Sequence, residues 1–422
     1  MQTLEREAGQ LVRQFHAAPP QKQTHAAIAL VEFCNRQPRG REWRDACGRV
    51  GFVTAIALAV NIGDAPLQRN AIRALGDLML DHRDNQSAAA AVGAMPLLLQ
   101  LTTSRNAALQ QEAVRALGFF VEHHHDNQSD AGAARVVPHL VRLMKSSNTA
   151  LQKEAVITLG CLVDDHINNK SAAAAEGVIN HLLQLIWTKS SKSDLRKSVS
   201  AVKLQAVGVL GQLVNNHRDN QSAAAEAGAI PHLLQLTKPT STAIRKDSGI
   251  ALFQQYAGFA LGCLVEKHHG NQSAAAAAGA IPHMVQLTKS SNSDIQGSGI
   301  FCLRCLVINH HANQSAAVAA GAIPHLLQLT KSSNAATQKE ADLALGFLVN
   351  SHHANQEPAC AAAASAATAP VSASARHLAP GSRVRIEGLQ GRPEINGRTG
   401  VICGALEEAE HAVLDLILMQ VC

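Results

Sequence analysis

Histidine and cysteine are the side chains in this sequence whose spacing could support chemistry. One histidine series recurs at intervals and comprises His82, His123, His124, His125, His166, His217, His268, His269, His310, His311, His352 and His353. A second series comprises His139, His181, His232, His283 and His325. Imidazole binds metals and titrates near neutral pH, so the pattern suggests a metal-binding or pH-sensing stripe.

Geometry disfavours the metal hypothesis. If the histidines occupy equivalent places in stacked helices, they lie about 8–10 Å apart. One zinc ion requires ligand nitrogens at about 2.0–2.1 Å. The alternative is structural, because a histidine near a helix C-terminus interacts favourably with the last carbonyls and with the helix dipole. We therefore predict no metal and no cofactor.

The cysteines give little support for catalysis. Cys302 and Cys305 form a lone C-x-x-C, which lacks the second pair or preceding strand expected of a zinc or redox motif. Cys161, Cys263 and Cys305 occupy one equivalent place and are typical of small side chains in helical packing. The sequence shows no nucleotide-binding loop, nucleophile elbow or paired-carboxylate motif, so we predict a non-enzyme.

An Asn-Gln pair marks the repeat on which these residues are placed. It begins at Asn85, Asn127, Asn220, Asn271, Asn313 and Asn355, with Asn169-Lys170 as a variant. The spacings are 42, 42, 51, 51, 42 and 42 residues. A fixed period of this length is typical of a helical solenoid in which each copy packs against the next.

One copy, beginning at Asn313, predicts three helices. Asn313 or Ser315 is expected to cap a short first helix, and Gly321 to take the left-handed conformation that follows it. Pro324 is expected in the first turn of a second helix, and Asn334 as the cap of a longer third helix. The third helix carries an apolar stripe at helical spacing, formed by Ala341, Leu345, Leu348 and Val349.

These motifs also carry a family resemblance. Asn-x-x-Ala, Gly-Ala-Ile-Pro-x-Leu-Leu-x-Leu and Gln-x-Glu-Ala-x-x-Ala-Leu-Gly-x-Leu together resemble the armadillo repeat. The agreement is nearly letter for letter at Gly228–Pro231, Gly279–Pro282 and Gly321–Pro324. The resemblance implies an all-α, right-handed solenoid of about seven three-helix repeats, with a concave groove formed by the third helices.

Departures from the period predict the domain organisation. Residues 1–42 are expected to form an N-terminal helical cap, 43–356 the solenoid and 357–377 an Ala/Ser/Pro linker. Residues 378–422 resemble a small β-barrel module with a hairpin turn at Asn396-Gly397, although 407–420 is more typical of an amphipathic helix. Within the third repeat, Arg135 replaces the expected glycine, which predicts backbone strain.

The fourth and fifth repeats each contain nine extra residues before or within the third helix. Each insertion carries a basic pair, Arg196-Lys197 in one and Arg245-Lys246 in the other. The two pairs are expected on the same side of the stack and predict a patch for an acidic partner. The alternative is a solvated charged loop.

The resemblance also allows one binding mode to be tested. In the importin-α type, a Trp and an Asn four residues later on each third helix clamp an extended basic peptide. The Trp places hold Arg73, Arg115, Ile157, Gly208, Phe259, Phe301 and Leu343, and the Asn places hold Asp77, Phe119, Cys161, Gln212, Cys263, Cys305 and Phe347. No place matches, so that clamp is not expected.

A different partner-binding groove is predicted on the same helices. Its candidate residues are Arg73, Asp77, Arg115, Phe119, Ile157, Gln212, Phe259, Phe301, Leu343 and Phe347. The apolar members suit an amphipathic helix or an extended apolar segment. The alternative is that they pack between neighbouring third helices.

Composition limits the class of protein. A net charge of +5 with one Tyr and two Trp among 422 residues does not indicate nucleic-acid binding, and the longest apolar run is too short to cross a bilayer. The cysteine usage and the absence of a signal peptide predict a cytoplasmic or nuclear protein. We predict a scaffold that binds a protein or peptide and no small-molecule substrate. The alternatives are an adaptor in ubiquitin-ligase or vesicle/vacuole-docking machinery, a His-rich metal-binding protein and a nucleic-acid binder.

Overall fold

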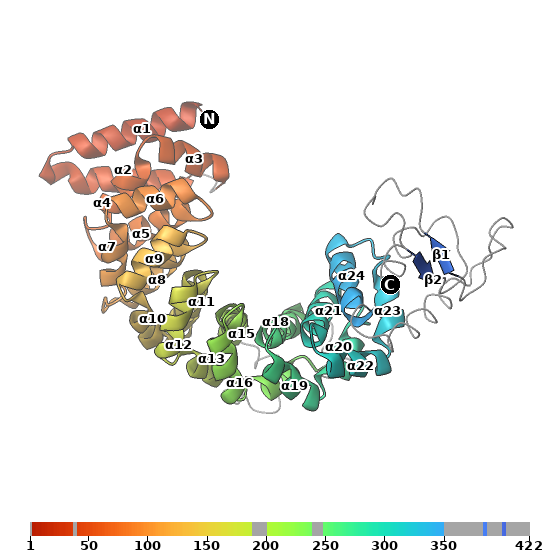
Figure 1. Ribbon diagram of the computed structural model, residues 1–422. Coiled ribbons are helices and arrows are strands. Elements are labelled where there is room, and N and C mark those ends of the chain that lie inside the picture. Colours follow the sequence, from red (N-terminus) through yellow and green to blue (C-terminus); the bar gives the residue numbers. More distant parts are fainter. Residues whose placement is uncertain are drawn as a thin grey trace. The chain divides into compact units, whose positions relative to one another are not determined.

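The computed structural model describes residues 2–36, 40–187, 201–238 and 248–349, together with the backbone of 383–385 and 399–401 (Figure 1). The chain divides into two compact units, Met1–Asn220 and Gln221–Cys422. Apart from the two three-residue strands and the turns, the described residues are helical.

Two long helices, α1 (Gln2–Ala17) and α2 (Gln23–Arg36), precede the repeats, with a short 3-10 turn at Pro20–Lys22 between them. α1 packs against α2, α3 and α4, and α2 packs against α4 and α5. Phe33 of α2 is fully buried, and its ring lies 5.2 Å from that of Phe52. The helices thus cover the first repeat with apolar side chains. The first helix of the first repeat, α3, begins at Arg41, near the predicted end of the cap at residue 42. That boundary stays a prediction.

In the described part of the chain, seven helix triplets follow, each with a short first helix, a second helix and a longer third helix. In the first unit they are α3 (Arg41–Arg49), α4 (Phe52–Ala59) and α5 (Ala65–Met79); α6 (Arg83–Ala91), α7 (Ala94–Leu101) and α8 (Ala107–Val121); α9 (His125–Ala133), α10 (Val136–Met144) and α11 (Thr149–Val163); and α12 (Ile167–Ala175), α13 (Val178–Trp187) and α15 (Ala201–Val214).

The unit boundary falls within α16, the first helix of the fifth triplet. This triplet and the two after it are α16 (Arg218–Glu226), α17 (Ala229–Leu236) and α18 (Ser248–Val265); α19 (His269–Ala277), α20 (Ala280–Leu287) and α21 (Ser293–Val307); and α22 (His311–Ala319), α23 (Ala322–Leu329) and α24 (Ala335–Val349). The basic pairs of the two insertions, Arg196-Lys197 and Arg245-Lys246, lie outside the described residues.

Third helices pack on third helices within each unit. In the first unit α5 packs on α8, α8 on α11 and α11 on α15; in the second, α18 packs on α21 and α21 on α24 (Figure 1). The predicted stripe of α24 is buried along its whole length, at Ala341, Leu345, Leu348 and Val349. Burial of apolar side chains between successive copies therefore supplies the core, which confirms the predicted helical solenoid.

The Asn-Gln pair holds this stack together by hydrogen bonds. Asn271 Nδ2 donates to the Leu264 carbonyl at 2.8 Å and to the Gln221 carbonyl of the preceding first helix at 3.1 Å. Gln272 Nε2 donates forward to the Cys305 and Ile308 carbonyls of the next repeat. The Leu264, Cys305 and Ile308 carbonyls lie at the ends of third helices, where carbonyls have no partner within the helix.

The bridge recurs in the other repeats. Equivalent pairs of bonds are made by Asn85, Asn127, Asn169, Asn220 and Asn313. Gln86, Gln128 and Gln221 also reach forward to two carbonyls. In the variant pair, Lys170 Nζ replaces the amide and donates to the Asn215 carbonyl at 2.8 Å.

The caps of the first helices differ from the expectation. Neither Asn313 nor Ser315 is the N-cap; His310 is, and its Nδ1 accepts the Asn313 amide at 3.3 Å. His82, His124, His166, His217 and His268 accept an amide in the same way. The prediction that these histidines serve the C-termini of third helices is therefore wrong, because their rings lie at the N-terminus of the following helix.

The other local predictions are confirmed. Gly321 has φ of +79°, and Pro324 lies in the first turn of α23. Asn334 Oδ1 accepts the amides of Ala336 and Thr337 at the start of α24. Arg135 keeps the left-handed conformation of the glycine it replaces, with φ of 55°.

The predicted C-terminal barrel is not supported. β1 (Arg383–Arg385) pairs antiparallel with β2 (Thr399–Val401), placing Val384 opposite Gly400. These are the only strands in the described part of the chain, and a two-stranded ladder of this length has no core of its own. The rest of 378–422 and the linker 357–377 lie outside the described residues.

Replacing Arg135 by glycine is expected to stabilise the protein. Removing a Cβ from a left-handed residue recovers about 1–2 kcal/mol, and the greater backbone freedom of glycine offsets about 0.5–1 kcal/mol of this. The urea midpoint should therefore rise slightly. The matched change Gly321→Arg should lower it, since a Cβ at Gly321 meets no atom within 4 Å and only the backbone is strained. A lower midpoint for Arg135→Gly would contradict the strain.

Asn313→Ala should cost more stability than loss of an ordinary helix cap. It leaves two buried carbonyls, those of Leu306 and Gln272, without their side-chain donor, at about 2–3 kcal/mol. Asn292→Ala removes only the cap of α21 and should cost about 1 kcal/mol. Urea unfolding of both variants, with hydrogen exchange of α22, checks the order; equal costs would count against the bridge.

Candidate partner-binding surface on the third helices

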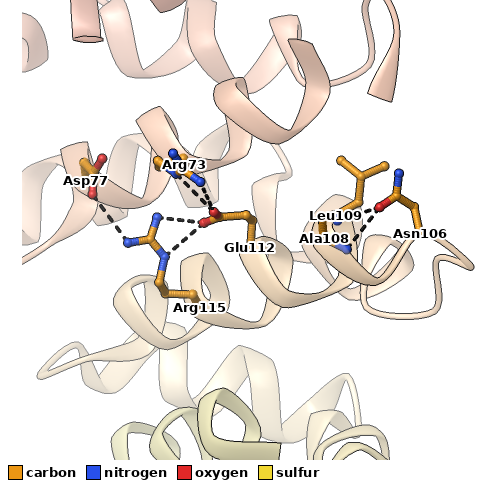
Figure 2. A network of polar contacts seen from close by, with 7 residues as sticks. All are labelled: Arg73, Asp77, Asn106, Ala108, Leu109, Glu112 and Arg115. Carbon is orange, nitrogen blue, oxygen red and sulfur yellow. Dashed lines mark hydrogen bonds and ion pairs between the residues drawn. The ribbon is translucent and has the colours of Figure 1, made fainter. Parts of the chain in front are cut away.

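We call the outward side of α5, α8, α11 and α15 in the first unit, and of α18, α21 and α24 in the second, the third-helix surface. An asparagine N-cap fixes where each of several third helices begins. In α8, Asn106 Oδ1 accepts the amides of Ala108 and Leu109 at 3.0 and 3.3 Å (Figure 2). The same cap begins α11, α21 and α24, so residues at equivalent places in successive repeats meet across the helix contacts.

A network of charged side chains lies on this surface in the first unit. Figure 2 shows Glu112 of α8 between Arg73 of α5 and Arg115 of its own helix. Arg73 Nε donates to Glu112 Oε1 at 3.0 Å, and Arg115 Nε donates to Glu112 Oε2 at 3.1 Å. Arg115 also forms an ion pair with Asp77 of α5, at 3.8 Å.

The network neutralises the charges that the sequence predicted for binding. Two arginines face two carboxylates, and the hydrogen bond to Glu112 raises the pKa of Arg73. The guanidinium of Arg115 also lies over the Phe119 ring, 5.6 Å from its centroid. These residues therefore link α5 to α8, which gives them a structural role in addition to any contact with a partner.

Glu112 was not among the predicted site residues. Its signal was present in the Gln-x-Glu-Ala motif, which places a glutamate three residues before the Trp place of the repeat. Glu340 occupies the same place in α24 and bonds to Arg304. At Glu154, the equivalent residue of α11, burial raises the carboxyl pKa.

The other predicted groove residues of the first unit lie on α11 and α15. Ile157 of α11 is half-buried. Gln212 of α15 donates to Asp164 Oδ1 at 3.3 Å, so this predicted groove residue also bonds to a neighbouring repeat.

An apolar strip occupies the surface in the second unit. Phe259 of α18 and Phe301 of α21 stack, with ring centroids 5.3 Å apart and planes 23° apart. Phe259 is 39% exposed, Leu252 on the same face of α18 is 36% exposed, and Leu343 at the equivalent place in α24 is 42% exposed. We call Leu252, Phe259, Phe301 and Leu343 the apolar strip. Phe347, one turn beyond Leu343, is half-buried.

One cation borders the strip. Arg304 lies over the Phe301 ring at 5.0 Å, donates to Glu340 at 2.9 Å and contacts Glu266 at 3.5 Å. This guanidinium thereby links α21 to α24 and to Glu266, the residue that follows α18, and its charge is balanced by two carboxylates. Beside it, Phe259 is 39% exposed and Phe301 is half-buried.

The structure thus places most of the predicted groove residues in two clusters, each within its own unit. Arg73, Asp77, Arg115 and Phe119 belong to the charged network, while Phe259, Phe301, Leu343 and Phe347 lie along or beside the apolar strip. The four residues of the basic insertion patch, Arg196, Lys197, Arg245 and Lys246, lie outside the described residues. That any of these residues binds a partner stays a prediction.

The buried thiols have a packing environment. Cys302 and Cys305 are fully buried, and burial raises the pKa of each well above its ordinary value. Thiols that stay protonated are poor nucleophiles and poor metal ligands. Within the described ranges, no three or more His, Cys, Asp or Glu side chains gather closely enough to hold a metal ion. No helix in the part of the chain that the structure describes has both the length and the apolarity needed to cross a membrane.

A family model described as the plant U-box protein ARM repeat region matches residues 54–247. No curated protein matches the chain. Among solved structures, an engineered protein from a structural genomics consortium has a TM-score of 0.66 at 24% identity, covering 81% of this chain and 78% of its own. A designed armadillo repeat protein has a TM-score of 0.52 at 19% identity, covering 60% of this chain and 99% of its own.

Another designed armadillo repeat protein, in complex with the peptide (KR)4, has a TM-score of 0.51 at 19% identity, and the match covers 60% of this chain and 99% of that one. At these identities the likeness concerns the fold. Together with the matched repeat region, it supports the armadillo resemblance seen in the sequence.

A double-mutant cycle on Arg73→Gln and Glu112→Gln is expected to give a coupling energy of about 0.5–1 kcal/mol, since the pair is partly exposed. The coupling should shrink between 0.05 and about 1 M salt because screening weakens exposed pairs. Urea denaturation of the four proteins measures it. A coupling near zero at low salt would show that the network does not link the two helices.

Proposed function

We propose that this armadillo-type solenoid is a non-catalytic scaffold that binds a partner protein or peptide through its third-helix surface. The observation that carries the proposal is the apolar strip. Leu252, Phe259 and Leu343 are each more than a third exposed, and the Phe259 ring is already stacked on Phe301. Adjacent exposed apolar side chains on a rigid support are typical of binding surfaces.

The chemistry of the strip favours an apolar segment as ligand. Stacked third helices are spaced by about 8–10 Å, so about three residues of an extended chain, at about 3.3–3.6 Å per residue, span one repeat. The partner's apolar side chains would then contact Phe259, Phe301 and Leu343 in turn. Aromatic anchors of this kind commonly contribute most of the binding energy at an interface.

A purely basic peptide is a poorer candidate. The peptide (KR)4 belongs to the complex of the designed relative. Here the equivalent places carry none of the Trp or Asn residues of the importin-α clamp. The carboxylates that border the strip, Glu266 and Glu340, are already bonded to Arg304.

The basic insertions provide a second contact in the proposal. Arg196, Lys197, Arg245 and Lys246 would attract acidic residues of a partner. Charge of this kind raises the rate of association more than the final affinity.

A second candidate function is that of an adaptor in ubiquitin-ligase machinery. The observation that favours it is the match of residues 54–247 to the repeat region of plant U-box proteins. In such an adaptor the third-helix surface would hold the protein to be modified. Ubiquitin transfer to the captured partner, reconstituted with ubiquitin-activating and -conjugating enzymes and a ligase, would distinguish this candidate from a plain scaffold.

The variant Phe259→Ser/Phe301→Ser tests the main proposal. Peptides are first selected on the wild-type chain from a displayed random library, and their affinities are then measured by fluorescence anisotropy. Loss of both rings should weaken binding by more than tenfold, the usual result for central aromatic anchors. The peptide (KR)4 serves as the comparison ligand and should bind more weakly than the selected apolar peptides.

Leu58→Ser is the matched control, because Leu58 is 48% exposed and lies on α4, a second helix of the first unit. It should leave peptide affinity unchanged. Circular dichroism separates the two explanations of the double variant. Cooperative unfolding at the wild-type temperature with lost binding supports the proposal, whereas early unfolding with retained affinity shows that the rings serve packing.

A further inference from the structure

Five histidines join neighbouring repeats through both ring nitrogens. In each case Nδ1 accepts the amide that begins a first helix, and Nε2 lies 2.9–3.0 Å from a serine hydroxyl of the preceding repeat. We call each such pair a histidine joint. The joints are His124 with Ser87, His166 with Ser129, His217 with Ser171, His268 with Ser222, and His310 with Ser273.

The geometry fixes the protonation state of these rings. A backbone N–H is always a donor, so Nδ1 must carry a lone pair. The ring hydrogen is therefore on Nε2, from which it donates to the serine oxygen. A neutral imidazole in this tautomer satisfies both contacts, and no other protonation state does.

Protonation would disrupt both parts of the joint. A hydrogen on Nδ1 would face the amide that it now caps, and the first helix would lose its cap. The new positive charge would lie at the positive end of the helix dipole, where a cation is unfavourable. His124, His217 and His310 are only 3%, 7% and 5% exposed, so water can compensate little.

The groups around the joints mostly oppose protonation. At His124, burial and Arg83 lower the ring pKa, while Asp126 and Asp130 raise it to a smaller extent. At His166, burial and the neighbouring ring of His125 lower the pKa.

At His310, burial lowers the pKa, as do His269, whose ring is stacked at 4.1 Å, and His311. Beside His217 along the chain stand Arg218 and Asp219, and beside His268 stand Lys267 and His269.

We propose that the histidine joints make the stacking of the repeats pH-sensitive, so that the repeats are held together at neutral pH and separate locally in mildly acidic solution. Because the joints recur through both units, the response is distributed along the stack. It needs no bound ligand and no change in the third-helix surface itself.

The sign follows from the lowered pKa values of His124, His166 and His310. An opened joint exposes a histidine of ordinary pKa, about 6.5, which binds a proton that the closed joint does not. The stabilisation is therefore fully present above about pH 6.5 and is lost as the pH falls toward the folded pKa values. Each joint can change the opening constant by up to about tenfold per pH unit in this range.

His82, which lies one repeat before the first histidine joint, offers a natural comparison. His82 caps α6 in the same way, but its Nε2 contacts Asp45 Oδ1 at 2.8 Å where the other joints have serine. A carboxylate favours the charged ring. His82 has a carboxylate partner where the five serine-bonded histidines have a hydroxyl.

Nuclear magnetic resonance of the full chain, labelled with ¹⁵N and ¹³C at histidine, tests the proposal directly. The five joint histidines should show the tautomer protonated at Nε2 at pH 7.5, and His124, His166 and His310 should titrate below about pH 6.5, the ordinary value. Amide hydrogen exchange of the first helices should accelerate at least tenfold between pH 7.5 and 5.5, after correction for the intrinsic rate. An Nδ1-protonated tautomer, or titration at or above the ordinary pKa, would overturn the proposal.

A matched pair of variants separates the joints from the remaining histidines. His310→Asn keeps a good N-cap that does not titrate, and should reduce the pH dependence of exchange in α22. His232→Asn removes an exposed histidine of a second helix and should leave that dependence unchanged. Ser273→Asp copies the contact of His82 and should raise the pH at which His310 titrates. Equal pH dependence in the wild type and His310→Asn would also overturn the proposal.

Discussion

Side-chain amides that satisfy the carbonyls at the ends of neighbouring helices are the interaction on which the rest of this structure depends. A third helix ends with carbonyls that have no donor of their own, and in a stacked array these ends are buried. An Asn such as Asn271 bonds to one of them, the Leu264 carbonyl, and to the Gln221 carbonyl of the preceding first helix, and the following Gln272 bonds forward to two more carbonyls at the end of the next third helix. The apolar stripes supply most of the driving force for stacking, but the amides define which repeat meets which and in what register.

This shared frame leaves the outward face of the third helices open to variation. In the first unit that face carries Arg73, Glu112 and Arg115 in a closed network of charges. In the second unit the equivalent places carry the stacked rings of Phe259 and Phe301. The same backbone geometry thus presents one surface whose charges are satisfied internally and another whose apolar area is exposed. In the second unit, Leu252, Phe259 and Leu343 are more than a third exposed, and exposed apolar surface gains free energy when it is covered.

Histidine illustrates how position decides the role of a titratable side chain. At a helix C-terminus a charged imidazole would be favoured, and the sequence pattern suggested that placement. At the N-terminus, where His310 lies, the ring must be neutral because it accepts an amide hydrogen. Placing the imidazole at the N-terminus of a helix instead of the C-terminus therefore reverses the charge state that is favoured for the ring. This placement couples the stacking of the repeats to pH.

The sequence by itself determined the period, the three helices of each copy and the buried stripe of residues such as Leu345, because these follow from local spacing and from the conformations of glycine and proline. It also indicated which residues share the third-helix surface. Only the tertiary structure decided what the polar residues bond to. Gln128 and Asn220 reach carbonyls 33 to 50 residues away, and Glu112 pairs with an arginine of another repeat. Those partners are set by how repeats stack, a relation between distant segments that no local pattern specifies.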